Sequence, residues 1–157
     1  MAAEARRAGL RLRAEDGDDL AVISACLQDA IVPVRDLAYD PDQREFLLVA
    51  NRFRWENGVA PAPGETAFER TLCGLAFRDV SGVSYRGFRR SEGDRLLSLL
   101  AIRPEDGAED RTVLLEFSGG AVIRLEVGHI DAHATDLGEP WPTPWRPDHV
   151  AEEEAGG

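Results

Sequence analysis

Three residues in the last third of the chain carry side chains that proteins use to bind transition metals. His129, Asp131 and His133 form the pattern H-x-D-x-H, and imidazole with carboxylate is a suitable ligand set for zinc or ferrous iron. In an extended segment all three side chains point to one side, but the two histidines then lie roughly 13 Å apart. A single metal ion would reach both only if the chain bends. A metal site and an ordinary polar strand face therefore remain alternative interpretations.

A second candidate site combines arginine with aromatic residues in the middle of the chain, at residues 52–55 and 85–90. Guanidinium groups bind carboxylate or phosphate through paired hydrogen bonds and stack on planar groups. We therefore consider this cluster as a site for a small anionic metabolite, with ordinary pairing to neighbouring glutamates as the alternative. The candidate residues are Arg52, Arg54, Trp55, Arg86 and Arg89.

The charge distribution places this cluster in the only part of the chain with net positive charge. The formal net charge is −11, and all 18 basic residues are arginine. Residues 44–95 contain nine arginines and seven acidic residues, whereas both flanking segments are net negative. A negative field repels nucleic acids and anionic membranes, so we expect neither as a partner.

Catalytic patterns are not recognisable in the sequence. There is no G-x-S-x-G motif, and Cys73 lies in an apolar run that should raise its thiol pKa rather than lower it. The acidic loop at 105–110 lacks calcium-loop spacing, and no glycine-rich phosphate loop occurs. We expect no cofactor and no catalytic residue. A non-enzymatic binding or adaptor domain with an unknown protein partner is favoured, and the alternative is an enzyme or sensor that binds a small anionic metabolite.

The elements that must position these residues are mostly strands. Residues 96–102, 112–117 and 121–127 are apolar or alternating runs separated by polar segments, which predicts three consecutive antiparallel strands. Gly119 and Gly120 suit the turn between the last two, because glycine adopts positive φ angles at little cost. Further strands are predicted at 10–13, 32–39, 45–55, 68–77 and 80–88.

One helix is predicted near the N-terminus, at about residues 17–29. Asp16 is a suitable N-cap, and Leu20, Ile23 and Leu27 follow helical spacing. Pro33 lies in the predicted strand at 32–39. Because proline has no N–H to donate, we expect this strand to lie at an edge of the sheet or to begin at Pro33.

These elements indicate an α+β fold with a predominantly antiparallel sheet. About seven strands would form a strongly curved sheet or a half-open barrel, with the helix over one mouth as in PH-like domains. Residues 1–150 are expected to form a single globular domain, and residues 151–157 an acidic disordered tail.

Two tryptophans near the C-terminal end are interface candidates. Trp141 and Trp145 lie in a proline-rich arm, where large apolar side chains usually dock against the body of a protein. We expect them to pack on the sheet, and the alternative is that they serve a protein partner.

The N-terminal sequence MAAEARRAGLRLR carries charges where a signal peptide needs an apolar segment. We therefore expect no secretion and a cytoplasmic location. The two cysteines, Cys26 and Cys73, are expected to be free thiols in a reducing compartment.

Four long segments carry a resemblance to a known family. They are LRLRAEDGDDLAVISACLQDAIVPVRDLAYD, FLLVANRFRWE, LLSLLAIRPED and DLGEPWPTPWRPDH. Together they resemble an alphaproteobacterial family catalogued as domain-of-unknown-function family 2948, over nearly the whole chain. The resemblance implies a small cytoplasmic bacterial protein, and it brings no activity, cofactor or catalytic residue.

Overall fold

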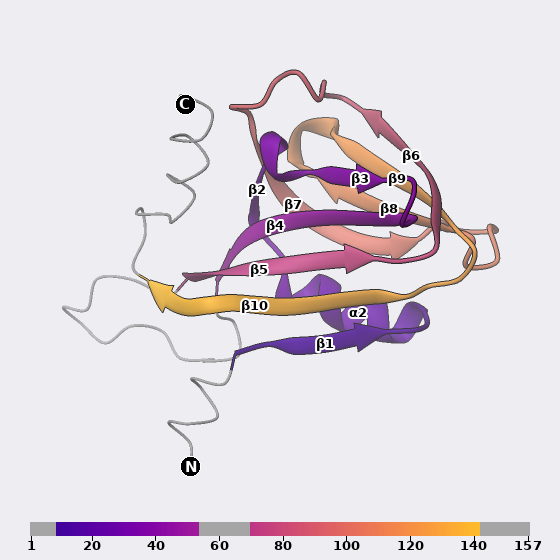
Figure 1. Cartoon of the computed structure of the whole chain (residues 1–157), viewed down its shortest axis with the longest axis horizontal. Helices are drawn as coiled ribbons and strands as arrows, with labels where there is room; N and C mark the ends of the chain where they lie inside the picture. The colour runs from indigo at the N-terminus through magenta and orange to yellow at the C-terminus, as the bar shows by residue number, and fades with distance from the viewer. Residues whose placement is uncertain (1–8, 54–69, 142–157) are drawn as a thin grey trace, which may run out of the picture.

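A computed structural model describes residues 9–53 and 70–141 of the chain, with side chains as far as Leu137. In these residues the chain forms one helix, two short 3₁₀ turns and a mostly antiparallel ten-stranded sheet (Figure 1). The elements in chain order are β1 (Arg11–Ala14), α2 (Gly17–Cys26), β2 (Ile31–Pro33), η1 (Val34–Asp36), β3 (Ala38–Asp40), β4 (Glu45–Phe53), β5 (Arg70–Phe77), β6 (Val80–Arg86), β7 (Leu96–Pro104), β8 (Thr112–Phe117), η3 (Ser118–Gly120), β9 (Val122–Val127) and β10 (Ala132–Trp141).

The strands follow the order β1-β10-β5-β4-β2-β7-β8-β9-β6, and β3 pairs with the start of β4. Strand β7 joins two halves of the sheet, because its first residues pair with β2 and the remainder pairs with β8. The register shifts between Leu99 and Ala101, at the point where β7 passes from one half to the other. The halves form two layers whose inner faces share the core (Figure 1).

Helix α2 covers the core beside β1 and β7. Asp16 caps it by accepting a hydrogen bond from the Asp19 main-chain N–H at 2.8 Å, and Leu20 and Ile23 are buried. The helix ends at Cys26, earlier than the predicted residue 29. The reason is that Asp29 turns with φ of 65° and donates its N–H to Leu99 O, so the chain already joins β7.

The expected number of about seven strands is wrong, because the described residues form ten. The predicted strand at 32–39 is divided by η1 into β2 and β3. Strand β10 was missed, because the nearby prolines argued against regular structure. It pairs with both β1 and β5, and its register shifts between Leu137 and Trp141.

Two further expectations about the sheet need correction. The ladder ends at β1 and β6 without closing, so the barrel is not confirmed in the described residues. Strand β2 does not lie at an edge, because β4 and β7 flank it and Pro33 is its last residue. Within the same residues, no helix is long and apolar enough to cross a membrane.

Side chains link β6 to the β3 region, where no strand ladder connects them. The Tyr39 hydroxyl donates to Val80 O at 2.9 Å, and Arg90 donates to Leu37 O at 3.0 Å. Arg90 also contacts the Tyr85 hydroxyl at 3.2 Å, and its guanidinium lies 5.2 Å from the ring centroid. These contacts hold the two layers together at the margin where the sheet remains open.

Gly87, directly after β6, packs against the turn between β8 and β9. It has φ of 83°, and a Cβ atom at this position would lie 2.7 Å from Gly120 O and 2.9 Å from Ala121 Cα. Both neighbours are main-chain atoms, so they can move only if the turn itself shifts. Gly107 has a similar φ of 77° but nothing within 4 Å of its Cβ position.

We expect Gly87→Ala to lower the free energy of unfolding by about 3 kcal/mol, because backbone strain and steric overlap add. The control Gly107→Ala should cost only about 1 kcal/mol, because it has the strain alone. Urea titration of both variants measures the difference. Equal midpoints would show that the turn relaxes around the added methyl group.

Candidate functional site

A groove of about 530 Å³ lies against β6, β8 and β9, next to the loop after β7. Cross-strand pairing explains its composition, because Arg86, Val122 and Glu116 form one row across the three strands. Ser84, Arg124 and Leu114 form the next row. The lining residues are Ser84, Tyr85, Arg86, Glu105, Leu114, Glu116, Val122 and Arg124.

The groove combines an apolar surface with charged surroundings. Leu114 and Val122 occupy outward positions of β8 and β9, and both are only half-buried. Their neighbours along each strand, such as Leu115 and Ile123, point into the core. An apolar surface beside a few fixed charges is the usual composition of a ligand site.

Most of the groove's charged side chains already pair with one another. Glu116 accepts hydrogen bonds from Arg103 at 2.9 and 3.2 Å. These bonds raise the pKa of Arg103 above its usual value. Arg124 lies 3.1 Å from Glu105 and 3.4 Å from Glu126.

Arg86 differs from these residues. Its side chain is exposed, and it has no carboxylate partner among the described residues. Within the described part of the chain, the groove therefore contains one guanidinium group without a carboxylate partner, beside Val122 on the neighbouring strand.

Arg52, another residue of the predicted anion site, lies in the core instead. Its guanidinium donates to both oxygens of Asp136, at 2.8 and 2.6 Å, and also to Phe53 O at 2.9 Å. The side chains of Arg52 and Asp136 are 0% and 5% exposed, so the pair is shielded from solvent. Asp136 also accepts from the Leu10 N–H at 2.7 Å. These contacts connect β4 to β10 across β5, and β10 to the residues before β1.

The structure does not bring the predicted arginine cluster together. Strands β2, β7, β8 and β9 separate β4 from β6 in the sheet order, so Arg52 is remote from Arg86 along the ladder. Arg89 is exposed in the segment after β6, outside the groove lining, where its main-chain N–H donates to Glu92 at 2.7 Å. Arg54 and Trp55 lie outside the described residues.

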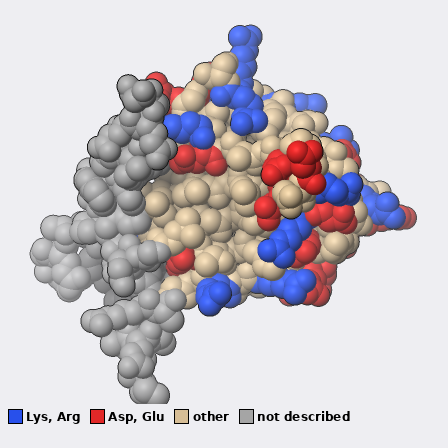
Figure 2. All heavy atoms as spheres, in the orientation of Figure 1, with Lys and Arg blue, Asp and Glu red and all other residues tan. Residues whose placement is uncertain are grey.

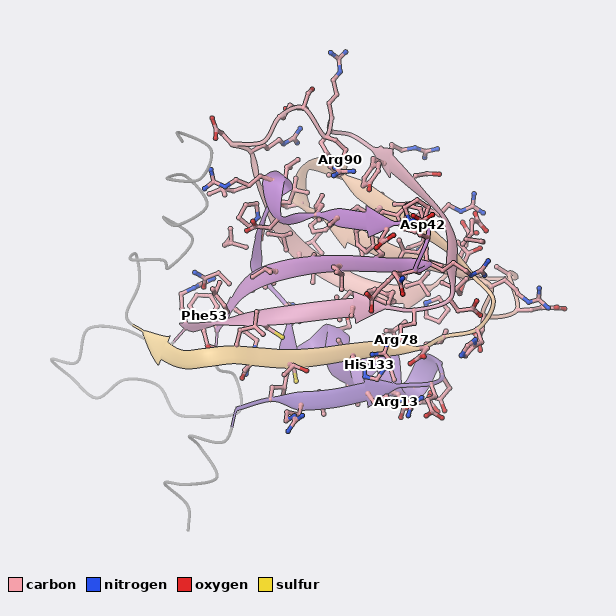
Figure 3. The ribbon with its side chains drawn as sticks, in the orientation of Figure 1. Arg13, Asp42, Phe53, Arg78, Arg90 and His133 are labelled. Carbon is pink, nitrogen blue, oxygen red and sulfur yellow. The ribbon has the colours of Figure 1, made fainter. Side chains whose placement is uncertain are left out.

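The two histidines of the H-x-D-x-H pattern contact different carboxylates. His129 Nδ1 lies 2.8 Å from Asp79 Oδ2, and His133 Nε2 lies 3.0 Å from Asp131 Oδ1. The chain bends between β9 and β10, so only His133 is in a regular strand, opposite Arg13 of β1 (Figure 3). Among the described residues, no group of three or more His, Cys, Asp or Glu side chains is arranged around a possible metal position. The metal site stays a prediction.

The tryptophan arm is only partly described. Trp141 ends β10 opposite Arg70, but its side chain and the whole of Trp145 lie outside the described residues. Figure 2 shows few charged side chains over β10, β5 and β4, and Leu47 and Leu137 are exposed on these strands. The docking of the tryptophans on this surface stays a prediction.

Cys73 is confirmed as a buried free thiol. Burial is the main cause that raises its pKa to about 12, and the nearby Asp136 carboxylate adds to the effect. This agrees with the expectation that its apolar surroundings make it unsuitable as a nucleophile. Cys26 likewise forms no disulfide among the described residues, and it is half-buried at the end of α2.

Sequence reasoning missed both the groove and the buried ion pair. In the sequence, Val122, Arg124 and Glu126 alternate with Ile123, Leu125 and Val127, and this partly charged strand face is the one local signal for the groove. Arg52 and Asp136 are separated by 84 positions, and no local pattern relates them.

We expect Asp136→Asn to destabilise the fold by about 3–5 kcal/mol, because the Arg52 charge would remain buried without its counter-charge. Arg52→Met should have a similar cost, because it leaves the carboxylate unpaired. The double variant Arg52→Met/Asp136→Asn removes both charges, and it should recover much of the stability lost in either single variant. Chemical denaturation of all four proteins completes the cycle, and strictly additive losses would contradict strong coupling.

Asp79 gives a pH-dependent prediction. Hydrogen bonds from Arg44 and His129 lower the pKa of its carboxyl group, so folding favours the charged form. The contribution of these contacts to the free energy of unfolding is complete above the pKa of the unfolded state, about 3.9. It is lost as the pH falls through the lower pKa of the folded state. Asp79→Asn should therefore reduce the unfolding midpoint at pH 7 and have little effect near pH 2.

The matched control for this titration is Asp42→Asn, an exposed aspartate in the nearby β3–β4 turn. It makes the same change in net charge. A loss of stability at pH 7 that is equal in the two variants would show a general charge effect rather than the Asp79 contacts.

Comparison with known proteins gives one informative match. No curated protein and no solved structure matches the chain. A family profile described as "Protein of unknown function (DUF2948)" matches residues 10–149, which confirms the resemblance noted in the sequence. The match covers most of the chain, so the protein belongs to the DUF2948 family.

Proposed function

We propose that the protein is a non-enzymatic binding domain that holds an anionic ligand in the groove formed by β6, β9 and β8. The observation that carries this proposal is Arg86, an exposed guanidinium without a carboxylate partner in the described residues, beside a partly apolar groove. Arginine at such a position binds a carboxylate or phosphate through two parallel hydrogen bonds.

The geometry also limits the rest of the ligand. Leu114 and Val122 would contact an apolar or planar body, and the hydroxyl of Ser84 can donate or accept one hydrogen bond. The groove volume of about 530 Å³ is within the usual size range of small-molecule sites. A ligand with one anionic end and a short apolar body satisfies both features.

The paired carboxylates favour binding over proton transfer. Both oxygens of Glu116 accept hydrogen bonds from Arg103, and Glu105 lies against Arg124. A general base needs an oxygen free to reach the substrate proton. Here these oxygens maintain the shape of the groove, which supports a binding role.

The test uses thermal unfolding at low salt with a panel of aliphatic and aromatic carboxylates and organic phosphates. A ligand that binds only the folded state raises the melting temperature of the wild type. We expect this rise to disappear in Arg86→Ala and to weaken in Arg86→Lys, because lysine cannot form the paired hydrogen bonds.

Arg89→Ala is the matched control, because Arg89 is also exposed but lies outside the groove lining. It removes the same charge and should retain the rise in melting temperature. A rise that survives in Arg86→Ala would contradict the proposal, as would equal losses in the two variants. A panel without effect on the wild type would also count against it.

A further inference from the structure

We infer that the ligand of the groove is a zwitterion, with a carboxylate at one end, an ammonium group at the other and a short apolar chain between them. This inference rests on the proposed binding function and specifies the class of its ligand. It begins from the lining of the groove, which contains Glu105 and Glu116 as well as Arg86 and Arg124. Both oxygens of Glu116 already accept from Arg103, so Glu105 is the acidic residue that remains to be considered.

Strand pairing places Arg86 and Glu105 at opposite corners of the groove. Arg86 ends β6, opposite Val122 of β9. Glu105 comes after β7, where its N–H donates to Thr112 O at the start of β8. Its carboxylate lies 3.1 Å from Arg124, which is diagonally across from Arg86 on the neighbouring strand. Diagonal Cβ atoms are about 7–8 Å apart, so a ligand with a chain of several carbon atoms spans the two ends.

Each end of the groove has one charge in excess, within the described part of the chain. Arg86 has no carboxylate partner there. At the other end, Arg124 is shared by two carboxylates, at 3.1 Å from Glu105 and 3.4 Å from Glu126. One guanidinium group is therefore unmatched beside β6, and one carboxylate is unmatched beside the loop after β7.

The segments next to the two ends extend this separation of charge. Two arginines follow β6 within four residues, and the loop at residues 105–110 contains four carboxylates. That loop is near the start of β6, because Arg111 O accepts from Val127, which pairs with Val80. Figure 1 shows this loop and the segment after β6 at opposite ends of the strand. The resulting field favours a ligand with one charge of each sign, in a fixed orientation.

The middle of the groove is apolar. Val122 and Leu114 are half-buried on β9 and β8, on the diagonal that leads from Arg86 to Glu105. The methylene groups of a ligand would cover these two side chains and remove apolar surface from water.

The charges also decide between kinds of ligand. A carboxylate matches one guanidinium group, whereas a phosphate group carries about −1.5 to −2 charges at neutral pH. A ligand with two anionic ends would bring its second charge against Glu105. An ammonium group there has three N–H donors, and a carboxylate has lone pairs for several of them. Glu105 can therefore accept from the ligand and keep its contact with Arg124.

The probe is 6-aminohexanoate, and its controls are hexanoate and hexylamine, each of which has only one of the two charged ends. Affinities are measured at low salt by NMR titration of the amide signals. We expect 6-aminohexanoate to bind about fivefold more tightly than hexanoate, which is the effect of one ion pair at a half-exposed site. Hexylamine should bind more weakly than 6-aminohexanoate by a similar factor.

Glu105→Gln tests the acidic end of the groove. It should lower the affinity for 6-aminohexanoate about fivefold and should not weaken hexanoate binding, which also verifies that the groove is intact. Glu109→Gln is the matched control, because Glu109 is an exposed glutamate of the same loop outside the groove lining. It should leave both affinities nearly unchanged. Arg86→Ala should lower both.

The outcomes separate this inference from the proposed function on which it rests. Equal affinity for hexanoate and 6-aminohexanoate would overturn the zwitterion and leave anion binding in place. Binding of neither compound would count against both proposals. Equal losses in Glu105→Gln and Glu109→Gln would show a general effect of charge and would overturn the assigned contact. Hexylamine binding as tight as that of 6-aminohexanoate would make the groove a cation site, contrary to both proposals.

Discussion

The buried ion pair between Arg52 and Asp136 is the interaction on which the arrangement of the larger layer depends. The two side chains come from β4 and β10, with β5 between them, and Asp136 also fixes the main chain of Leu10. The last strand is thereby held between the first strand and the middle of the sheet. Charges in a low-dielectric core are stable only as a satisfied pair, so this contact also selects the register of three strands.

The other layer has a different constraint, which is the open edge of the sheet. Closing a sheet into a barrel satisfies every strand edge, but here β6 remains unpaired on one side in the described residues. Tyr39 and Arg90 connect it to the β3 region through side-chain hydrogen bonds. Such contacts hold the two layers together across this open margin. The candidate groove lies on the same layer, against β6, β8 and β9.

Arginine has separate roles in this lysine-free chain. Arg52 is a structural charge in the core, and Arg103 and Arg124 maintain the groove through glutamate contacts. Only Arg86 combines a groove position with a guanidinium that lacks such a partner in the described residues. All of these residues look equivalent in the sequence. The difference lies in burial and in the distance to the nearest carboxylate, which decide whether a guanidinium group stabilises the fold or is available to a ligand.

The sequence by itself determined the features that depend on neighbours along the chain. The Asp16 cap and the apolar spacing of α2 identified the helix, and the turn at Gly119 and Gly120 identified the hairpin of β8 and β9. These features follow from backbone preferences and side-chain periodicity, which act over a few residues. They were sufficient for the α+β class and the mainly antiparallel sheet, and the family could be identified from the long segments that it shares.

Only the tertiary structure decided which distant residues meet. It placed β10 between β1 and β5, paired Arg52 with Asp136, and separated Arg52 from Arg86. No local preference encodes these contacts, because a strand can pair with any edge that matches its pattern of apolar residues. The choice comes from burying all apolar faces together while every buried charge finds a partner. That collective requirement set the number of strands, the open edge of β6 and the position of the groove.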